Sequence, residues 1–181
     1  MTANGTLDEA LRHVARGWAV LPVGHDKEPA GRLIRATRGG DGRWAPLGSR
    51  PADVDEVAAW FELDPATGIG VLTGEPSGVV DVDDVNAAPE LPATATVSTG
   101  RGGGAHHAYY RSSEPARTRE FAWGEVRGEG AYVVAPCSRH GLGRRYRWQL
   151  SPEDVVELTD FRGSTQVSPV LLIGRGDELI V

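Results

Sequence analysis

One five-residue stretch, Val79-Val80-Asp81-Val82-Asp83, limits most strongly what this chain can fold into. Valines alternate with aspartates, and successive side chains of a β-strand point to opposite faces of the sheet. The stretch therefore predicts a strand that buries Val80 and Val82 on one face and presents Asp81 and Asp83 together on the other.

The two aspartates predict a site for a divalent cation. Their carboxylates would lie about 7 Å apart along the strand and repel each other, and a cation between or beside them relieves this repulsion. Magnesium-type ions prefer oxygen ligands, often one or two carboxylates together with substrate phosphates. Asp84 follows the pair and should point the other way at the end of the strand. The alternative is a solvent-exposed strand face that carries two hydrated acids.

The remaining pattern predicts a single α+β domain over residues 1–181, with a central mixed or antiparallel sheet flanked by helices. The 24 glycines and 12 prolines are spread between apolar runs, which indicates many turns. Helices are expected from the capping-box sequence at residues 6–9 to Gly17, over 51–61 and over 152–158, and a long loop over 24–50. Strands are expected at 18–23, 69–72, 79–83, 106–111, 125–127, 131–135 and 146–150, with 125–127 and 131–135 forming a pair and a further apolar stretch at 167–173.

Cysteine content and hydropathy predict a cytoplasmic protein. Cys137 is the only cysteine, so an internal disulfide is excluded. No apolar run approaches the roughly 20 residues of a membrane helix, and the first residues lack the order of a signal peptide. We therefore expect no contact with a membrane.

The distribution of charge predicts local phosphate binding within an acidic chain. The net charge is −6, yet residues 101–147 contain nine arginines and four glutamates, a local charge of +5. Short-range contacts can bind phosphates even where the net charge is negative. A hydrated arginine-rich surface is the alternative explanation.

A glycine run, Gly100-Arg101-Gly102-Gly103-Gly104, precedes two histidines and a strand-like segment. Glycines allow backbone amides to approach phosphate oxygens, and a histidine at the start of the strand could contact the same phosphates. The spacing from the glycines favours His106, whereas the spacing from the strand favours His107. We prefer His107, because loops tolerate an inserted residue whereas a one-residue slip in a strand reverses every side chain. A flexible hairpin loop with an incidental histidine is the alternative.

Taken together, residues 7–150 resemble the N-terminal domain family of bifunctional DNA primase/polymerases, a branch of the archaeo-eukaryotic primase superfamily. The resemblance rests on short motifs that occur in the family's order, and residues 151–181 would be a C-terminal extension. The motifs are Gly17-Trp18-Ala19-Val20, Lys27-Glu28-Pro29, Ile69-Gly70-Val71-Leu72-Thr73-Gly74, Pro76-Ser77-Gly78-Val79-Val80-Asp81-Val82-Asp83, Ser98-Thr99-Gly100, Glu125-Val126-Arg127-Gly128, Tyr132-Val133-Val134-Ala135-Pro136 and Gly143-Arg144-Arg145-Tyr146.

The resemblance implies a catalytic core related to RNA-recognition-motif folds, with three acids that bind two divalent ions, Mg²⁺ or Mn²⁺. Asp81 and Asp83 match the paired acids, and Glu125 stands at a position that the family usually fills with aspartate. His107, or His106, matches the histidine that contacts the triphosphate.

The same resemblance implies a nucleotidyltransferase that extends a strand on a DNA template from nucleoside triphosphates. Lys27, Arg127 and Ser138 are the further candidate nucleotide contacts, although the two cations could instead pair with nearby acids. Arg144 and Arg145 are the candidate contacts to the DNA backbone. A helicase on another chain or domain is a further partner that the resemblance allows. The alternatives are a nucleotide- or DNA-binding relic without activity, which the Glu125 substitution favours, and a metal-dependent phosphoesterase or nuclease.

Overall fold

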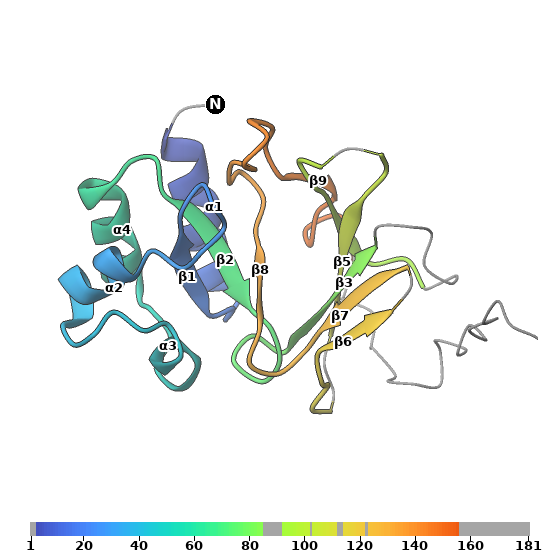
Figure 1. Ribbon diagram of the computed structural model, residues 1–181, viewed down its shortest axis with the longest axis horizontal. Coiled ribbons are helices and arrows are strands. Elements are labelled where there is room, and N and C mark those ends of the chain that lie inside the picture. Colours follow the sequence, from blue (N-terminus) through green and yellow to red (C-terminus); the bar gives the residue numbers. More distant parts are fainter. Residues whose placement is uncertain (1–2, 85–91, 102, 112–113, 122, 156–181) are drawn as a thin grey trace, which may run out of the picture.

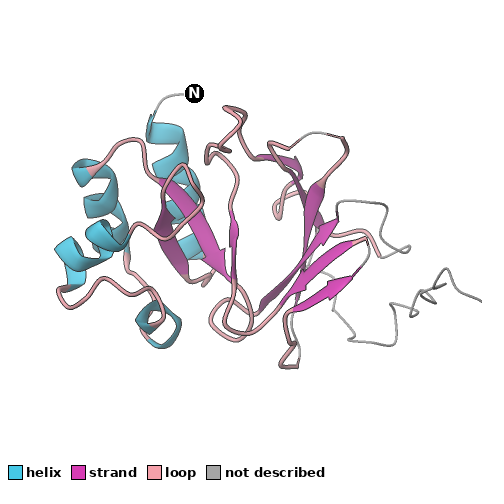
Figure 2. Cartoon of the chain, viewed as in Figure 1, coloured by secondary structure: helices cyan, strands magenta, loops and turns pink. Residues whose placement is uncertain are grey.

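The computed structural model describes residues 3–84, 92–101, 103–111, 114–121 and 123–155 (Figure 1). This part of the chain forms four helices, all in its first 63 residues, and nine strands, eight of which follow the helices, which confirms the predicted α+β class (Figure 2). The helices are α1 (Ala3–Ala15), α2 (Gly31–Arg38), α3 (Pro46–Ser49) and α4 (Val54–Leu63). The strands are β1 (Val20–Val23), β2 (Gly68–Leu72), β3 (Val79–Asp84), β4 (Ala95–Ser98), β5 (His106–Arg111), β6 (Arg119–Phe121), β7 (Gly124–Arg127), β8 (Tyr132–Val134) and β9 (Arg147–Leu150).

The strands form two antiparallel sheets, where the sequence suggested one central sheet. One sheet has the order β1-β2-β8, and the other has the order β6-β7-β3-β5-β4-β9. The helices gather at the end of the molecule that holds β1 and β2, and the six-stranded sheet forms the other end (Figure 1). The chain alternates between the sheets, because β8 returns to the first sheet after β7 and β9 then rejoins the second.

The alternation predicted for β3 is present, and it divides the apolar residues into two cores. Val79 belongs to the larger core, which also contains Trp60 and Tyr109 and extends to the helices. Val80 and Val82 belong to a smaller core on the outer face of the six-stranded sheet. The face that carries Asp81 and Asp83 is consequently the inner one, which is turned toward the three-stranded sheet.

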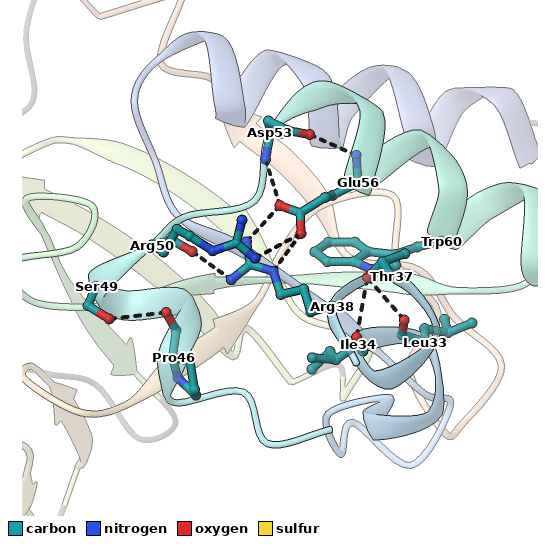
Figure 3. Close-up of polar contacts among 10 residues, drawn as sticks. All are labelled: Leu33, Ile34, Thr37, Arg38, Pro46, Ser49, Arg50, Asp53, Glu56 and Trp60. Atoms are coloured by element: carbon teal, nitrogen blue, oxygen red, sulfur yellow. Dashed lines mark hydrogen bonds and ion pairs between the residues drawn. The ribbon is translucent and has the colours of Figure 1, made fainter. Parts of the chain in front are cut away.

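Helix α4 begins at Val54 because Asp53 caps it. The Asp53 side chain accepts a hydrogen bond from the backbone N–H of Glu56, and the Glu56 carboxylate accepts one from the backbone N–H of Asp53 (Figure 3). This capping box satisfies two N–H groups that have no partner within the helix. The prediction of a helix from Pro51 was therefore three residues too early.

Glu56 also connects α4 to α2 and to the segment before α4. Its two carboxylate oxygens each accept a hydrogen bond of 2.7 Å from the guanidinium of Arg38. Arg38 donates a third bond to the backbone oxygen of Arg50. Nearby, the indole of Trp60 donates to Thr37 at 3.1 Å, which fixes the buried tryptophan against α2 (Figure 3).

Three local predictions were wrong. The expected loop at 24–50 contains α2 and α3, and α2 has no side-chain cap at Ala30 that would have signalled it. The first helix begins at Ala3, since the Thr6 hydroxyl does not cap it but donates to the backbone oxygen of Cys137 at 3.3 Å. Strands 125–127 and 131–135 do not pair with each other, because β7 pairs with β3 and β8 pairs with β2.

The segment between β7 and β8 crosses from one sheet to the other instead of forming a hairpin turn. Thr73 at the end of β2 donates to the backbone oxygen of Gly128 at 2.7 Å. A Cβ atom on Gly128 would lie 2.0 Å from the backbone oxygen of Ala116, so only glycine fits at this crossing.

Two further predictions fall wholly or partly outside the described residues, namely the helix at 152–158 beyond residue 155 and the apolar stretch at 167–173. Residues 152–154 form a turn. Within the described ranges, every helix is too short or too polar to span a bilayer.

Candidate active site

Strand β3 lies between β5 and β7, and its acids face side chains from both neighbours. Asp83 lies opposite His107 on β5 and Glu125 on β7. Residues directly opposite each other in an antiparallel sheet project to the same face. The structure therefore places the three predicted acids and His107 on one face of one sheet.

Asp81 and His107 form a buried ion pair on this face. Nδ1 of His107 lies 2.9 Å from Oδ2 of Asp81, and the Asp81 side chain has no exposed surface. Burial raises the pKa of Asp81, and the hydrogen bond from His107 only partly offsets this effect. Burial opposes the charged form of His107, but the attraction of Asp81 outweighs it and raises the histidine's pKa. His107 therefore holds its proton more tightly beside Asp81 than it would alone, and it makes the buried carboxylate of Asp81 easier to ionise.

The second oxygen of Asp81 is left without a partner. Oδ1 is buried and accepts no hydrogen bond within the described structure, and the hydroxyl of neighbouring Tyr109 is also unpaired there. A buried polar atom without a partner costs about 1–3 kcal/mol, so most such atoms in proteins are paired. An unpaired carboxylate oxygen at this point fits a site that is completed by a ligand.

Asp83 lines a pocket of about 270 Å³ at the seam between the two sheets. The six-stranded sheet contributes Asp83, His107 and Arg127, and the side of the three-stranded sheet contributes Lys27 and Tyr132. Arg101, from the predicted glycine run, and Thr99, His140 and Tyr146 add to the polar lining, and Asp26 and Glu28 flank Lys27 in it. The ring of Tyr146 stacks on that of His107 with 5.9 Å between the centroids.

Three cations, Lys27, Arg101 and Arg127, line this pocket together with three acids, Asp26, Glu28 and Asp83. Burial lowers the pKa of Lys27, and the positive charge of Arg101 lowers it further against the opposing effect of Asp83. Burial also lowers the pKa of His140, together with the charges of Lys27 and Arg101. Cations that disfavour one another in this way favour a bound anion such as a polyphosphate.

The backbone of Lys27 adopts a conformation that is rare for a residue with a side chain. Its φ angle is +73°, in the left-handed region. The Tyr132 hydroxyl donates to the backbone oxygen of Lys27 at 3.1 Å, and the turn is closed by a bond from the Gly24 N–H to the oxygen of Glu28. Strain of this kind is often found at binding sites, where the surrounding structure maintains it.

Glu125 and Arg127 neighbour each other on the same face of β7, and their side chains form an ion pair of 2.8 Å. Arg127 also donates to the backbone oxygen of Tyr132 at 3.1 Å and lines the pocket. The sequence left open whether Arg127 binds a phosphate or pairs with an acidic side chain. In this structure it pairs with Glu125. Its Nε is buried and unpaired among the described residues.

Asp81 and Asp83 offer the donor atoms that a divalent cation of the magnesium type requires. The orphaned Oδ1 of Asp81 is the observation that fits such an ion. Among the residues that the structure describes, no three His, Cys, Asp or Glu side chains are grouped closely enough to hold a metal unaided. Mg²⁺ is, however, usually bound by one or two carboxylates, and substrate phosphates complete its coordination.

Several other predicted residues lie outside this pocket. His106 lies on the opposite face of β5, with its Nδ1 3.1 Å from the oxygen of Gly104. Ser138 is buried, and its hydroxyl accepts from the N–H of Ile69 at 2.8 Å and donates to its oxygen at 3.2 Å. That pair of bonds fixes the edge of β2, which is a structural role.

The two arginines proposed to contact DNA border a separate hollow beside the pocket. Arg144 is exposed, whereas Arg145 donates a hydrogen bond to the backbone oxygen of Cys137. Both tyrosines of β5, Tyr109 and Tyr110, are buried in the two cores and have no free face for a base.

The pocket residues that were not predicted from the sequence include Arg101, His140 and Tyr146. Arg101 lies within the glycine run that predicted phosphate binding, so that run could have indicated it. His140 and Tyr146 reach the pocket from the segment before β9. Tyr146 ends the Gly143-Arg144-Arg145-Tyr146 motif, whereas no local pattern in the sequence points to His140.

Residues 10–161 match the family described as bifunctional DNA primase/polymerase, N-terminal. No protein of curated function is significantly similar to the chain in sequence.

Proposed function

Because the chain belongs to the bifunctional DNA primase/polymerase N-terminal family, we propose that it transfers nucleotides from triphosphates to a strand paired with a DNA template. The observation that carries this proposal is the position of the acids. Asp81, Asp83 and Glu125 share one inner sheet face with His107, beside a pocket whose cations suit a triphosphate.

The acids and the cations have separate roles in this proposal. Asp81 and Asp83 would hold divalent cations, and Glu125 would join them once Arg127 turns toward phosphate. Bound Mg²⁺ or Mn²⁺ would polarise the triphosphate and increase the acidity of the attacking hydroxyl. Lys27, Arg101 and Arg127, which line the pocket together with Asp83, would bind phosphate oxygens.

His107 would act through its neighbours as well as through its ring. Its hydrogen bond keeps Asp81 in a fixed orientation and offsets part of the cost of burying a carboxylate. Because His107 also lines the pocket wall, its ring would be placed to contact a phosphate oxygen of a bound triphosphate.

A binding domain without catalysis is the second candidate, and the two ion pairs favour it. Asp81 is held by His107, and Glu125 is held by Arg127, so each acid already has a protein cation beside it. A family member that had lost catalysis could keep this arrangement and still bind nucleotides at the cations. A nuclease that uses the same acids is the third candidate, which the test below also addresses.

The test is primer extension on a primed DNA template, with deoxynucleotides or ribonucleotides and with Mg²⁺ or Mn²⁺. We expect the parent protein to extend the primer and the double variant Asp81→Ala/Asp83→Ala to lose at least about 10³-fold in rate, because the charge stabilisation supplied by the ions amounts to several kcal/mol. The matched control is Asp8→Ala/Asp55→Ala, which removes two exposed acids from helices and should leave the rate unchanged.

Three outcomes would count against the proposal. Equal extension by the parent and the Asp81/Asp83 variant would exclude these acids as metal ligands. Nucleotide binding without extension under every condition would establish the binding domain. Release of nucleotides from DNA without added triphosphate would establish the nuclease.

A further inference from the structure

A basic turn connects Ser138 to β9 beside the catalytic pocket. Residues 139–147, which we call the arginine turn, contain four arginines and no acid, although the whole chain has a net charge of −6. The backbone of the turn is well fixed. Arg139 and Arg145 form a β-bridge, and the His140 N–H donates to the oxygen of Arg144 at 2.7 Å.

The tip of the arginine turn carries an exposed apolar side chain. Leu142 is 68% exposed and is one of three large hydrophobic residues on the described surface with this character. It lies between Gly141 and Gly143, and a bond from the Gly143 N–H to the oxygen of His140 closes the tip. Its own N–H donates to Nδ1 of His140 at 3.1 Å, which fixes the direction of the tip.

A hollow of about 460 Å³ borders the turn on the side of β4. Its lining combines the hydroxyls of Ser98 and Thr99 with cationic side chains of the arginine turn and includes no acid. Thr99 also lines the catalytic pocket, as does His140 from the tip of the turn. The hollow and the pocket are therefore adjacent, and a polyanion could pass from one to the other without meeting a carboxylate in the hollow.

We infer that the arginine turn binds the single-stranded part of the DNA template next to the catalytic pocket, with Arg144 and Arg147 on phosphates and Leu142 against the face of an unpaired base. This inference rests on the proposed function for the identity of the strand. Arginines bind phosphates in any sequence, and apolar side chains such as leucine can pack against exposed base faces in nucleic-acid complexes.

The same geometry assigns a different role to Arg145. Its guanidinium donates to the backbone oxygen of Cys137, and so it holds the base of the turn in place. Arg144 and Arg147 are exposed and are the residues that can meet the strand. An unpaired strand fits better than a duplex, because in a duplex the base faces are stacked and closed to Leu142.

The experiment measures fluorescence anisotropy of a labelled 20-nucleotide single strand and of the matching duplex at several salt concentrations. For Arg144→Ala/Arg147→Ala we expect at least about a tenfold loss of single-strand affinity. Because each phosphate contact contributes about 0.7 to the slope of log affinity against log salt, the slope should become shallower by about 1.4. For Leu142→Ala we expect about a fivefold loss with an unchanged slope, and a smaller loss on the duplex.

The controls are Arg32→Ala/Arg43→Ala and Leu63→Ala, which remove exposed arginines and an exposed leucine at the helical end of the molecule. The inference is wrong if the control arginines change the slope as much, if Arg144→Ala/Arg147→Ala binds as the parent does, or if Leu142→Ala loses no affinity. If the protein extends primers but the arginine-turn variants bind the single strand as the parent does, only this inference is refuted. If the arginine-turn variants lose single-strand affinity but the parent protein never extends primers, only the proposed polymerase function is refuted.

Discussion

Arg38 with Glu56, between two helices, and Asp81 with His107, on the six-stranded sheet, are both largely buried ion pairs, but they differ in how completely their polar atoms are paired. Each oxygen of Glu56 accepts at least two hydrogen bonds, and Arg38 adds one to a backbone oxygen. Asp81 accepts one bond through Oδ2, and its Oδ1 has no partner in the described structure.

The two buried histidines differ in a similar way. His13 on α1 stacks on Trp18, with 5.1 Å between centroids, and the nearest oxygen of Glu9 lies 3.7 Å from its Nε2. Burial lowers the pKa of His13 to about 4, which Glu9 offsets only in part. His107 has a carboxylate at 2.9 Å, and its pKa is raised. The helical end thus buries a histidine whose charged form is disfavoured, whereas the sheet buries a histidine whose charged form is favoured by a carboxylate.

The comparison shows that a buried charge alone does not identify a site. The Arg38–Glu56 cluster is complete within the protein and lines none of the pockets described above, so its effect is to join α2 to α4 (Figure 3). The Asp81–His107 pair is incomplete and borders a pocket, which is the combination that predicts a ligand. Three substitutions test this difference.

The largest effect is expected from Asp81→Asn. The amide preserves the shape and the bond with His107 but removes the charge, so we expect a loss of about 10³-fold in primer extension, because cation binding contributes several kcal/mol. The free energy of unfolding should stay the same or rise, since a buried charge is removed. Urea denaturation and extension assays measure the two quantities. If the variant is strongly destabilised while it remains active, Asp81 is structural and the comparison fails.

The next effect concerns the stability of the helical end at acid pH. The pKa of His13 is about 4 in the folded chain, against an ordinary histidine pKa of 6.5, so between these values the unfolded chain binds the extra proton. The contribution of His13 to the free energy of unfolding is therefore fully present above pH 6.5. It decreases by about 3 kcal/mol as the pH falls toward 4. The free energy of unfolding, measured by urea denaturation at several pH values from 4 to 7, should depend less on pH in His13→Gln than in the parent. The exposed His25→Gln should follow the parent, and equal slopes in all three proteins would contradict a neutral buried His13.

The smallest of the three effects is expected from Glu56→Ala. It leaves the largely buried Arg38 without its carboxylate and removes the capping box of α4, at a cost of about 2–3 kcal/mol in the free energy of unfolding. Extension per folded molecule should not change, because the cluster does not reach the pocket. Arg43→Ala, which breaks an exposed pair with Asp41, should cost less than about 0.5 kcal/mol. A loss of activity in Glu56→Ala beyond its loss of folded protein would remove the distinction between the two regions.

The fold was predictable where the sequence pattern is local. The alternation of β3 and the run of β5 were read correctly because each strand buries its apolar residues in register. The partners of β7 and β8 were not predictable from local pattern. Their pairing depends on contacts such as Thr73 with Gly128, which join residues 55 positions apart.

The acids of the site could be predicted from the sequence, but their surroundings could not. Strand alternation was sufficient to place Asp81 and Asp83 on one face. It could not show that Asp81 would be fully buried, that Glu125 would pair with Arg127, or that Ser138 would bind Ile69. Those properties arise from elements that meet only in the folded chain, as does the approach of His140 and Tyr146 to the pocket.

The return of β8 to the first sheet affects how the molecule can be assembled and divided. The three-stranded sheet lacks its third strand until residues 132–134 join it, after most strands of the other sheet have been made. Contacts so distant in sequence slow folding, because long loops must close before any pairing energy is gained. No single cut between β2 and β8 would yield two fragments that each hold a whole sheet. The walls of the pocket should accordingly form together, late and cooperatively, or not at all.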